Sequence, residues 1–351
     1  MSPKRKAVFA IPGDLDTVTG GYIYEKRLLE HLRRSGREVR HLRLPDSFPM
    51  PSDRDMEVSA AALSDVDPGT PIILDGFVSG GIDPVALASI RAPTIAMVHH
   101  PLAMESGLDA AQRTHLFTTE RANLELVDHV LVPSPHTAGL LVGEYGVPAE
   151  KITIATPGTD RPLQPQAAIE PPLILAVGLH HPRKGHDVLL KALGLIADLN
   201  WQACVVGRIH DAPSFEGLLT LRRDLGLETL VEIQGQVSQE ALDRLWTRAQ
   251  IFALASEFEG YGMVFAEALV RGLPVVACRA GAIQDTVPER AGLFAPPRDP
   301  EAFANALRTL LATPSLRAAK AEAARAAGAD LPEWDDTARI AGAILDRLSN
   351  S

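Results

Sequence analysis

Two glutamates in one short stretch have the type and spacing to do chemistry. Glu259 and Glu267 have seven residues between them within the segment Ser256–Ala268. A carboxylate can accept hydrogen bonds from neighbouring hydroxyl groups, or stabilise positive charge that develops during a reaction. Because the two glutamates occupy different parts of the segment, we do not expect them to share a proton. Their positions indicate two separate roles around an active-site loop.

The residues around this pair predict a strand, a loop and a helix. The apolar run Ala249–Ala255 is typical of a buried parallel strand, and Ser256–Gly262 is then the loop at its carboxyl end. Apolar residues recur at helical spacing from Met263 until Gly272–Pro274 ends the helix, and Val275–Cys278 is the next strand. Ligands of open α/β sheets bind at this edge, where a helix N-terminus offers amides to phosphate.

The loop residues allow a functional and a purely structural interpretation. Gly260 and Gly262 would let the loop backbone approach a phosphate closely. In the alternative, Glu259 caps the helix and Glu267 is a solvated surface residue.

The segment resembles a known motif. Glu259, Glu267 and the following 268–277, Ala-Leu-Val-Arg-Gly-Leu-Pro-Val-Val-Ala, resemble the nucleotide-sugar motif of retaining glycosyltransferases of family 4. The resemblance implies an α/β GT-B fold, in which two Rossmann-like, doubly wound parallel-sheet domains face a cleft. It also implies that Glu267 holds the ribose hydroxyls and that Glu259 lies near the sugar ring. The other donor-binding residues expected in this loop are Gly260, Tyr261, Gly262, Met263 and Val264.

Composition narrows the class of protein. The 351 residues are 46% hydrophobic, which is enough for two domains with cores, and the net charge of −10 argues against a general nucleic-acid binder. Cys204 and Cys278 lie in apolar runs, so we expect buried free thiols in a reducing compartment. The apolar run after the basic start Met1–Lys6 is too short for a signal peptide, and no stretch could span a bilayer. We expect a cytoplasmic protein, with the inner face of the membrane as a further place.

A glycine pair follows the first predicted strand. The strand Ala7–Ile11 runs into the loop Pro12–Gly21 and then a helix over about 22–35, an order that favours nucleotide or phosphate binding. Gly20 and Gly21 are adjacent, so they fit neither the dinucleotide fingerprint nor the phosphate loop. An ordinary turn is the alternative. In family 4 a glycine pair at this place lies over the donor diphosphate and the acceptor.

Basic residues gather in this helix and just after it. They are Lys26, Arg27, His31, Arg33, Arg34, Arg37, Arg40, His41 and Arg43. A solvated helix face is the simpler interpretation. The other is a patch that makes peripheral contact with anionic membrane or a phosphorylated lipid acceptor.

Two histidines end a later predicted strand. Pro93–Val98 opens into His99 and His100. A metal site would need further ligands at suitable spacing, and none accompanies this pair. In family 4 a histidine after this strand reaches the transferred sugar, and His99 matches by position better than His100.

A segment rich in Pro, Gln and Ala, Arg161–Pro172, predicts the linker. We therefore expect an N-terminal, acceptor-side Rossmann-like domain over 1–162 and a nucleotide-sugar-binding one over 163–332. By resemblance, the last helix within 333–351 packs back on the first domain.

One cation of the family pattern is missing. The family usually has an arginine directly after the glycine that ends the strand Leu173–Gly178, and a lysine five residues later, both of which grip the diphosphate. Lys184 matches the lysine, whereas Leu179 replaces the arginine. Arg183, Arg208 or a nearby histidine would compensate. His180, His181 and His186 are expected to be polar loop residues rather than metal ligands.

Two further loops resemble the family. The segment Gly235 to Val237 would pack against the nucleotide base. Arg279–Val287 is similar to the family's next loop, although Gln284 and Asp285 stand where proline and glutamate are common.

The resemblance predicts a metal-independent hexosyltransferase without a cofactor. It would move a sugar from a UDP- or GDP-sugar to a hydroxyl of a lipid-linked, saccharide or small-molecule acceptor, with retention, in cell-envelope polysaccharide or glycolipid biosynthesis. Glu259, His99 and Lys184 are the expected catalytic residues, and no nucleic-acid partner is expected. The alternatives are a nucleotide-sugar epimerase of the same fold and a non-catalytic nucleotide-sugar-binding protein, which Leu179 alone favours.

Overall fold

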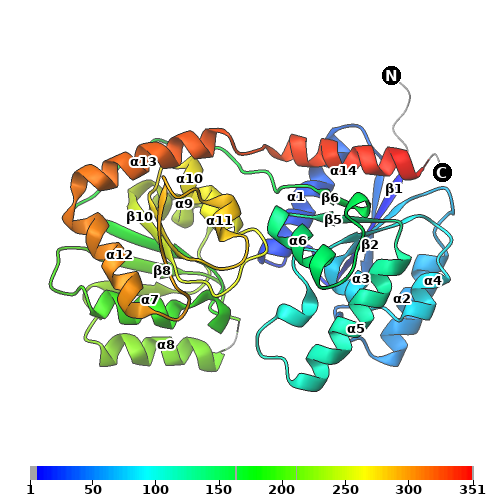
Figure 1. Cartoon of the computed structure of the whole chain (residues 1–351), viewed down its shortest axis with the longest axis horizontal. Helices are drawn as coiled ribbons and strands as arrows, with labels where there is room; N and C mark the ends of the chain where they lie inside the picture. Colours follow the sequence, from blue (N-terminus) through cyan, green and yellow to red (C-terminus); the bar gives the residue numbers. More distant parts are fainter. Residues whose placement is uncertain (1–5, 163, 211, 350–351) are drawn as a thin grey trace. The chain divides into compact units, whose positions relative to one another are not determined.

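A computed structural model describes residues 6–162, 164–210 and 212–349. The chain forms two compact units, Met1–Gly158 with Pro332–Ser351, and Thr159–Leu331. In each unit helices lie on both sides of a parallel sheet (Figure 1). The units divide four residues before the linker boundary expected from the sequence, and the last helix belongs to the first unit. The basic start Met1–Arg5 lies outside the described residues.

The first unit has six parallel strands in the order β2-β1-β3-β4-β5-β6. Short apolar runs such as Ile72–Asp75 are buried throughout, as strands covered on both faces should be. Because every strand is parallel, the carboxyl ends share one edge of the sheet. The strands are β1 (Ala7–Pro12), β2 (Val39–Leu44), β3 (Ile72–Asp75), β4 (Thr94–Met97), β5 (His129–Val132) and β6 (Ile152–Ile154).

Helix α1 (Gly20–Arg34) begins earlier than expected, because Thr19 caps it by accepting from the amide of Tyr22. The last helix, α14 (Trp334–Leu348), lies beside α1 in Figure 1, and the ring of Trp334 lies 5.6 Å from that of Tyr24. The other helices of this unit are α2 (Asp53–Ser64), α3 (Gly76–Gly81), α4 (Pro84–Ala88), η1 (Leu102–Met104), α5 (Ala110–Leu126), α6 (Pro135–Gly143) and η2 (Ala149–Lys151).

The second unit repeats the architecture with the strand order β12-β11-β10-β7-β8-β9. Its strands are β7 (Leu173–Val177), β8 (Gln202–Val206), β9 (Val231–Gln234), β10 (Ala249–Leu254), β11 (Val275–Cys278) and β12 (Gly292–Ala295). Its helices are η3 (Pro182–Lys184), α7 (His186–Gly194), α8 (Ala212–Asp224), α9 (Gln239–Arg248), α10 (Met263–Val270), α11 (Ile283–Thr286), α12 (Pro300–Ala312) and α13 (Pro314–Ala329). Cys204 and Cys278 are buried free thiols, as expected.

Candidate functional site

The second unit brings Glu259 and Lys184 together at the carboxyl edge of its sheet. Lys184 lies in the segment after β7 and Glu259 in the loop after β10, and these strands are neighbours. Lys184 Nζ donates to Glu259 Oε1 at 2.6 Å, and Arg183 Nη1 lies 3.9 Å from Glu259 Oε2. Arg183 also donates to the carbonyl oxygen of Phe258 at 2.8 Å. One carboxylate therefore has two cations beside it.

Backbone geometry fixes this pairing. Gly185 has a φ of +62°, and a Cβ at this position would lie only 2.1 Å from the carbonyl oxygen of Ala255, so glycine is required. The amide of Glu257 donates to the carbonyl oxygen of Arg183 at 2.8 Å. The two loops are thus joined by their main chains, which places the lysine opposite the glutamate.

The pKa of Glu259 reflects opposing effects. Burial raises the pKa of this carboxyl, but the charges of Lys184 and Arg183 and hydrogen bonds from Lys184 and Ser256 outweigh burial and hold the pKa below its ordinary value. The side chain is only 8% exposed. A buried carboxylate that remains ionised can stabilise positive charge on a substrate strongly, because little water screens it.

The loop after β11 supports the Glu259 loop. Gly281 has a φ of +54°, and a Cβ there would lie 2.4 Å from the carbonyl oxygen of Glu259. The amide of Ala282 donates to the same oxygen at 2.8 Å, and Thr286 Oγ1 donates to the carbonyl oxygen of Tyr261 at 2.6 Å. The segment that resembles the family's next loop therefore shapes the backbone that presents Glu259.

Helix α10 starts directly after Gly262, whose φ is +84°, and no side chain caps it. The alternative in which Glu259 caps this helix is therefore wrong. The first amides of a helix have no partner inside it, and they attract anions. The start of α10 offers such amides beside the buried carboxylate.

Glu267 lies further along α10 and is not a solvated surface residue. Burial raises its pKa to about 7, although the nearby Arg271 opposes the shift. Among the described residues, no group donates a hydrogen bond to its carboxyl oxygens. This carboxyl is available to hydroxyl donors and titrates near neutral pH.

Arg208 lies beside the leucine that replaces the family's arginine. His180 and Ile209 form a parallel bridge, which makes the preceding residues, Leu179 and Arg208, neighbours along the same register. Side chains at matching positions of parallel strands project to the same side. The Nε of Arg208 is buried, and the structure describes no hydrogen bond or ion pair from this guanidinium to other described residues.

Two histidines in the segment after β7 form hydrogen bonds with backbone carbonyl groups. His180 Nε2 lies 2.6 Å from the carbonyl oxygen of Gln234, and His186 Nε2 lies 3.0 Å from that of Leu179. Burial lowers the pKa of both rings, to about 4 for His186, so both are neutral donors at pH 7. Gln234 directly precedes Gly235, so the expected base-binding segment up to Val237 is tied to this loop.

The first unit brings Gly21 and His99 together at the carboxyl edge of its own sheet. A Cβ on Gly21 would lie 3.3 Å from His99 Cδ2, whereas a Cβ on Gly20 would meet nothing within 4 Å. Gly21 therefore makes room for the imidazole, and Gly20 faces open space. His100 turns to another partner, since its Nε2 lies 3.2 Å from Glu105 Oε2.

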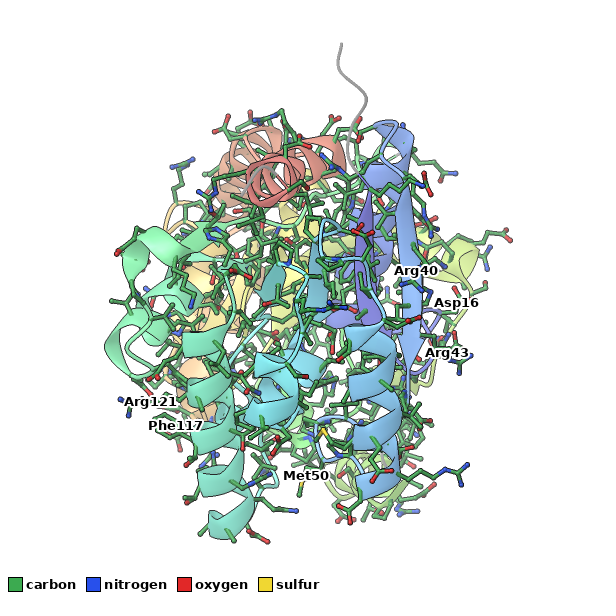
Figure 2. All side chains as sticks on the ribbon, turned by 90° about the vertical axis from the view of Figure 1, so that its right-hand side faces the viewer. Asp16, Arg40, Arg43, Met50, Phe117 and Arg121 are labelled. Atoms are coloured by element: carbon green, nitrogen blue, oxygen red, sulfur yellow. The ribbon has the colours of Figure 1, made fainter. Side chains whose placement is uncertain are left out.

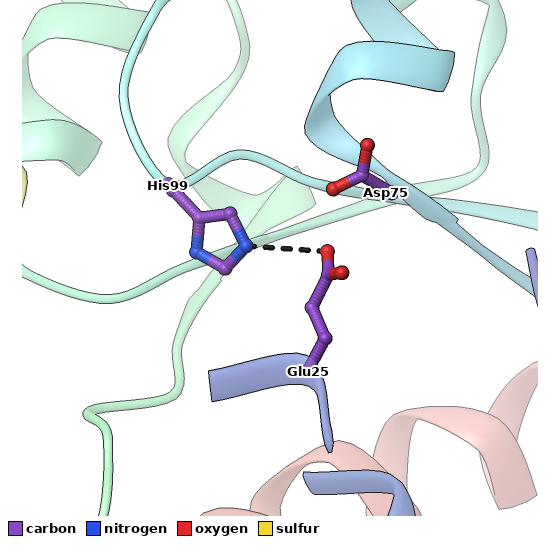
Figure 3. A group of neighbouring side chains, drawn as sticks. All are labelled: Glu25, Asp75 and His99. Carbon is purple, nitrogen blue, oxygen red and sulfur yellow. Dashed lines mark hydrogen bonds and ion pairs between the residues drawn. The ribbon is translucent and has the colours of Figure 1, made fainter. Parts of the chain in front are cut away.

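Two buried acids that the sequence analysis missed stand behind His99 (Figure 3). His99 Nε2 lies 3.3 Å from Glu25 Oε1, and Asp75 Oδ1 accepts from the amide of Phe77 at 2.8 Å. The sequence does contain features that could have identified both acids. Glu25 falls one helical turn after Gly21, and Asp75 ends an apolar run at the edge of the sheet where His99 lies.

The basic residues of α1 and of the turn after it largely make contacts inside the first unit. Arg33 donates to the carbonyl oxygen of Val39 at 3.0 and 2.8 Å, buried Arg37 donates to Asp346 at 2.7 Å, and His31 lies 2.6 Å from Asp335. Arg40 and Arg43 instead project from the edge strand β2 (Figure 2). The membrane-contact hypothesis thus loses most of its basis. Among the described residues, no helix has the length and apolar character that a bilayer crossing requires.

Comparison with known families fits this geometry. The model of "Glycosyl transferases group 1" matches residues 162–327, and that of "Glycosyltransferase Family 4" matches residues 72–161. The chain belongs to the glycosyltransferases of family 4. Its fold is GT-B, built from two Rossmann-like units.

Relatives of this glycosyltransferase include the D-inositol 3-phosphate glycosyltransferase of Streptomyces scabiei, 30% identical over 60% of this chain and 52% of the relative. Mannosylfructose-phosphate synthase of Agrobacterium fabrum is 28% identical over 52% of this chain and 46% of the relative. The chain thus spans about half the length of these curated relatives.

Among solved structures, sucrose-phosphate synthase of Thermosynechococcus elongatus superposes with a TM-score of 0.82 at 22% identity, covering 98% of this chain and 99% of that one. The Anabaena protein Alr3699/HepE in complex with UDP-glucose has a TM-score of 0.78 at 18% identity, covering 97% and 99%. At such low sequence identities, these superpositions show a shared fold and nothing about a shared substrate.

Proposed function

We propose that this glycosyltransferase moves a sugar from a nucleoside diphosphate sugar to an acceptor hydroxyl, with retention of configuration at the anomeric carbon. The observation that carries the proposal is the buried, ionised Glu259 between Lys184 and Arg183, beside the N-terminus of α10, which no side chain caps. The reaction requires negative charge stabilised on one side of the broken bond and positive charge on the other. This group of residues can supply both.

The departing diphosphate needs positive charge. Lys184, Arg208 and the first amides of α10 would provide it without a metal ion, each as a donor to phosphate oxygens. Arg183 already donates to the carbonyl oxygen of Phe258, so Arg208 is better placed to take over from the arginine that Leu179 replaces.

Glu259 would face the sugar ring as the leaving group departs. Its negative charge stabilises the positive charge that builds up on the ring, and its oxygens can accept from ring hydroxyls. We do not assign Glu259 as a covalent nucleophile, because the resemblance implies reaction on one face through a short-lived ion pair. His99 would accept a hydrogen bond from a sugar hydroxyl.

UDP-glucose is the first donor to try, since HepE was solved with it. The acceptor would be a saccharide, a small molecule or a lipid-linked sugar. The relatives named for inositol 3-phosphate and for mannosylfructose phosphate align over only about half of their length, so an acceptor panel should include phosphorylated and unphosphorylated acceptors.

A calorimetric panel of UDP, GDP, ADP and their glucose and mannose derivatives, with magnesium or with EDTA, tests the donor proposal. We expect one nucleotide to bind equally well under both conditions. Time-resolved proton NMR of donor turnover should then show the α-configured sugar first from an α-linked donor. A β-configured first product would contradict retention, and binding that needs magnesium would contradict metal independence.

The same NMR record separates the alternatives. A nucleotide-sugar epimerase would yield a new sugar nucleotide, and a non-catalytic binding protein would bind the nucleotide without any product. Transfer to an acceptor or to water, with release of the nucleoside diphosphate, favours the transferase.

Glu267 predicts a pH dependence of donor binding. Its carboxylate would accept from both ribose hydroxyls, so binding favours the ionised form. With a pKa of about 7 in the free protein, most of this group is protonated at pH 6 and ionised at pH 8. The affinity for UDP-glucose, if this is the donor, should therefore rise about tenfold from pH 6 to pH 8, measured by calorimetry. Glu267→Gln should bind more weakly and lose this slope; an equal slope in the variant would contradict the role.

A further inference from the structure

Two buried acids, Glu25 and Asp75, lie beside His99 in the first unit (Figure 3). Glu25 on α1 is 1% exposed, Asp75 at the end of β3 is 5% exposed, and the His99 side chain after β4 is 21% exposed. His99 Nε2 lies 3.3 Å from Glu25 Oε1. The imidazole therefore has one nitrogen against a buried acid.

The carboxyl groups of Glu25 and Asp75 are neighbours, since an oxygen of each and a nitrogen of His99 all lie within 4.8 Å of one another, and a single proton held between the two carboxyl groups would join them. Burial raises the pKa of Glu25 to about 7, and burial together with the charge of Glu25 raises the pKa of Asp75 well above its ordinary value. The described structure contains no Lys or Arg ion pair to either acid. Glu25 Oε2 is buried, and no hydrogen-bond partner among the described residues faces it.

The contacts of Asp75 indicate in which direction hydrogen bonds are donated among these three side chains. Asp75 Oδ1 accepts from the amides of Phe77 at 2.8 Å and Val78 at 3.4 Å, at the start of α3. Wherever the shared proton sits, Glu25 Oε1 keeps a lone pair toward His99. Burial lowers the pKa of His99, against the opposing charge of Asp75, so the ring is neutral and carries a single N–H.

We propose that Glu25, backed by Asp75, is a positioning residue that fixes the tautomer of His99: Nε2–H donates to Glu25, and Nδ1 stays unprotonated as an acceptor for a hydroxyl group of a sugar. The role of Nδ1 rests on the proposed function, whereas the tautomer does not. Without Glu25, the ring could turn or carry its proton on Nδ1, and a hydroxyl donor would then meet a second donor.

A divalent cation is the competing explanation of the same three side chains. Their potential ligand atoms lie within 4.8 Å of one another. A proton fits the contacts better, because Asp75 Oδ1 already accepts two amides and the spacing of His99 and Glu25 is that of a hydrogen bond. The experiment must nevertheless distinguish the proton from the metal.

Nitrogen-15 NMR of histidine-labelled protein tests the tautomer directly, with His99 assigned by the signal lost in His99→Asn. At pH 7.5 we expect wild type to show the Nε2–H form. Glu25→Gln should keep it, because the glutamine oxygen can accept from Nε2–H while its amide donates to Asp75. Glu25→Met, which fills a similar volume without an acceptor, should shift His99 toward the Nδ1–H form or a mixture. Glu105→Gln, next to His100, is the matched control and should leave His99 unchanged.

Turnover gives the second readout. Glu25→Met should lower kcat at least about tenfold with little change in the KM for donor, and Glu25→Gln should restore most of the loss. An unchanged His99 tautomer in folded Glu25→Met, or an Nδ1–H or protonated ring in wild type, would overturn the proposal. So would a stoichiometric shift of the His99 signals by Mg²⁺, Mn²⁺ or Zn²⁺ added to EDTA-treated protein. If wild type transfers no sugar but shows the expected tautomers, the proposed function fails while the positioning pair stands.

Discussion

Replacing Glu259 with glutamine is expected to lower kcat for sugar transfer by on the order of 100- to 1,000-fold. Glutamine has nearly the same shape and can still accept from Lys184, so the loop keeps its backbone contacts. It carries no negative charge, however, and cannot stabilise the positive charge on the sugar ring. The measurement is steady-state turnover of the donor that the calorimetric panel identifies.

Binding of UDP should survive this change or become tighter. In the wild type, Glu259 partly neutralises Lys184 and Arg183, which lie 2.6 and 3.9 Å from its carboxylate. Glutamine leaves both half-buried cations without that negative charge, and a diphosphate can replace it. Calorimetry with UDP should therefore give a Kd no higher than that of wild type. Weaker UDP binding together with lost turnover would indicate a disturbed loop rather than a lost charge.

Glu257→Gln is the matched control. Glu257 lies in the same loop, but its carboxylate pairs with Arg298 at 2.7 and 2.6 Å on the surface. Surface ion pairs contribute little, so this variant should keep near wild-type kcat and stability. An unchanged kcat in Glu259→Gln would remove the assigned role of Glu259.

Much of the fold could be predicted because its central strands are continuous apolar runs. Strands buried on both faces, such as Val275–Cys278, leave a signal that needs no knowledge of their neighbours. Edge strand β2 was missed for the opposite reason: Arg40 and Arg43 face solvent, so its residues looked like an extension of the basic helix. Periodicity reports burial, and an edge strand is only partly buried.

The site could be predicted less completely, because its contacts join residues far apart in the chain. Glu259 and Lys184 were each recognised by family motif, yet their pairing depends on two loops that Gly185 lets approach. Glu25 and Asp75 belong to no motif that was recognised. They become a pair only when α1 packs at the end of β3, which no local pattern encodes.

Replacing Arg208 with alanine is expected to weaken binding of the UDP-sugar or other identified donor by on the order of 100-fold, the effect of losing a charged hydrogen-bond donor to a phosphate oxygen. The prediction follows from register. The bridge between His180 and Ile209 sets Arg208 next to Leu179, on the side from which the family's arginine would project. Calorimetry measures the affinity, and Arg308→Ala, which removes a surface pair with Asp198, is the control.

Adding Leu179→Arg to Arg208→Ala should recover most of the lost affinity, because the new guanidinium would start from the neighbouring strand and reach the same diphosphate. A general loss of folding in Arg208→Ala would not be repaired in this way, so the rescue separates the charge from the structure. Failure of the rescue in a folded double variant would mean that the two positions do not address the same phosphate. Undiminished donor binding in Arg208→Ala would leave Lys184 and the start of α10 as the groups that hold the diphosphate. In that case no residue compensates for Leu179, and this chain binds the diphosphate with one positive charge fewer than the family pattern.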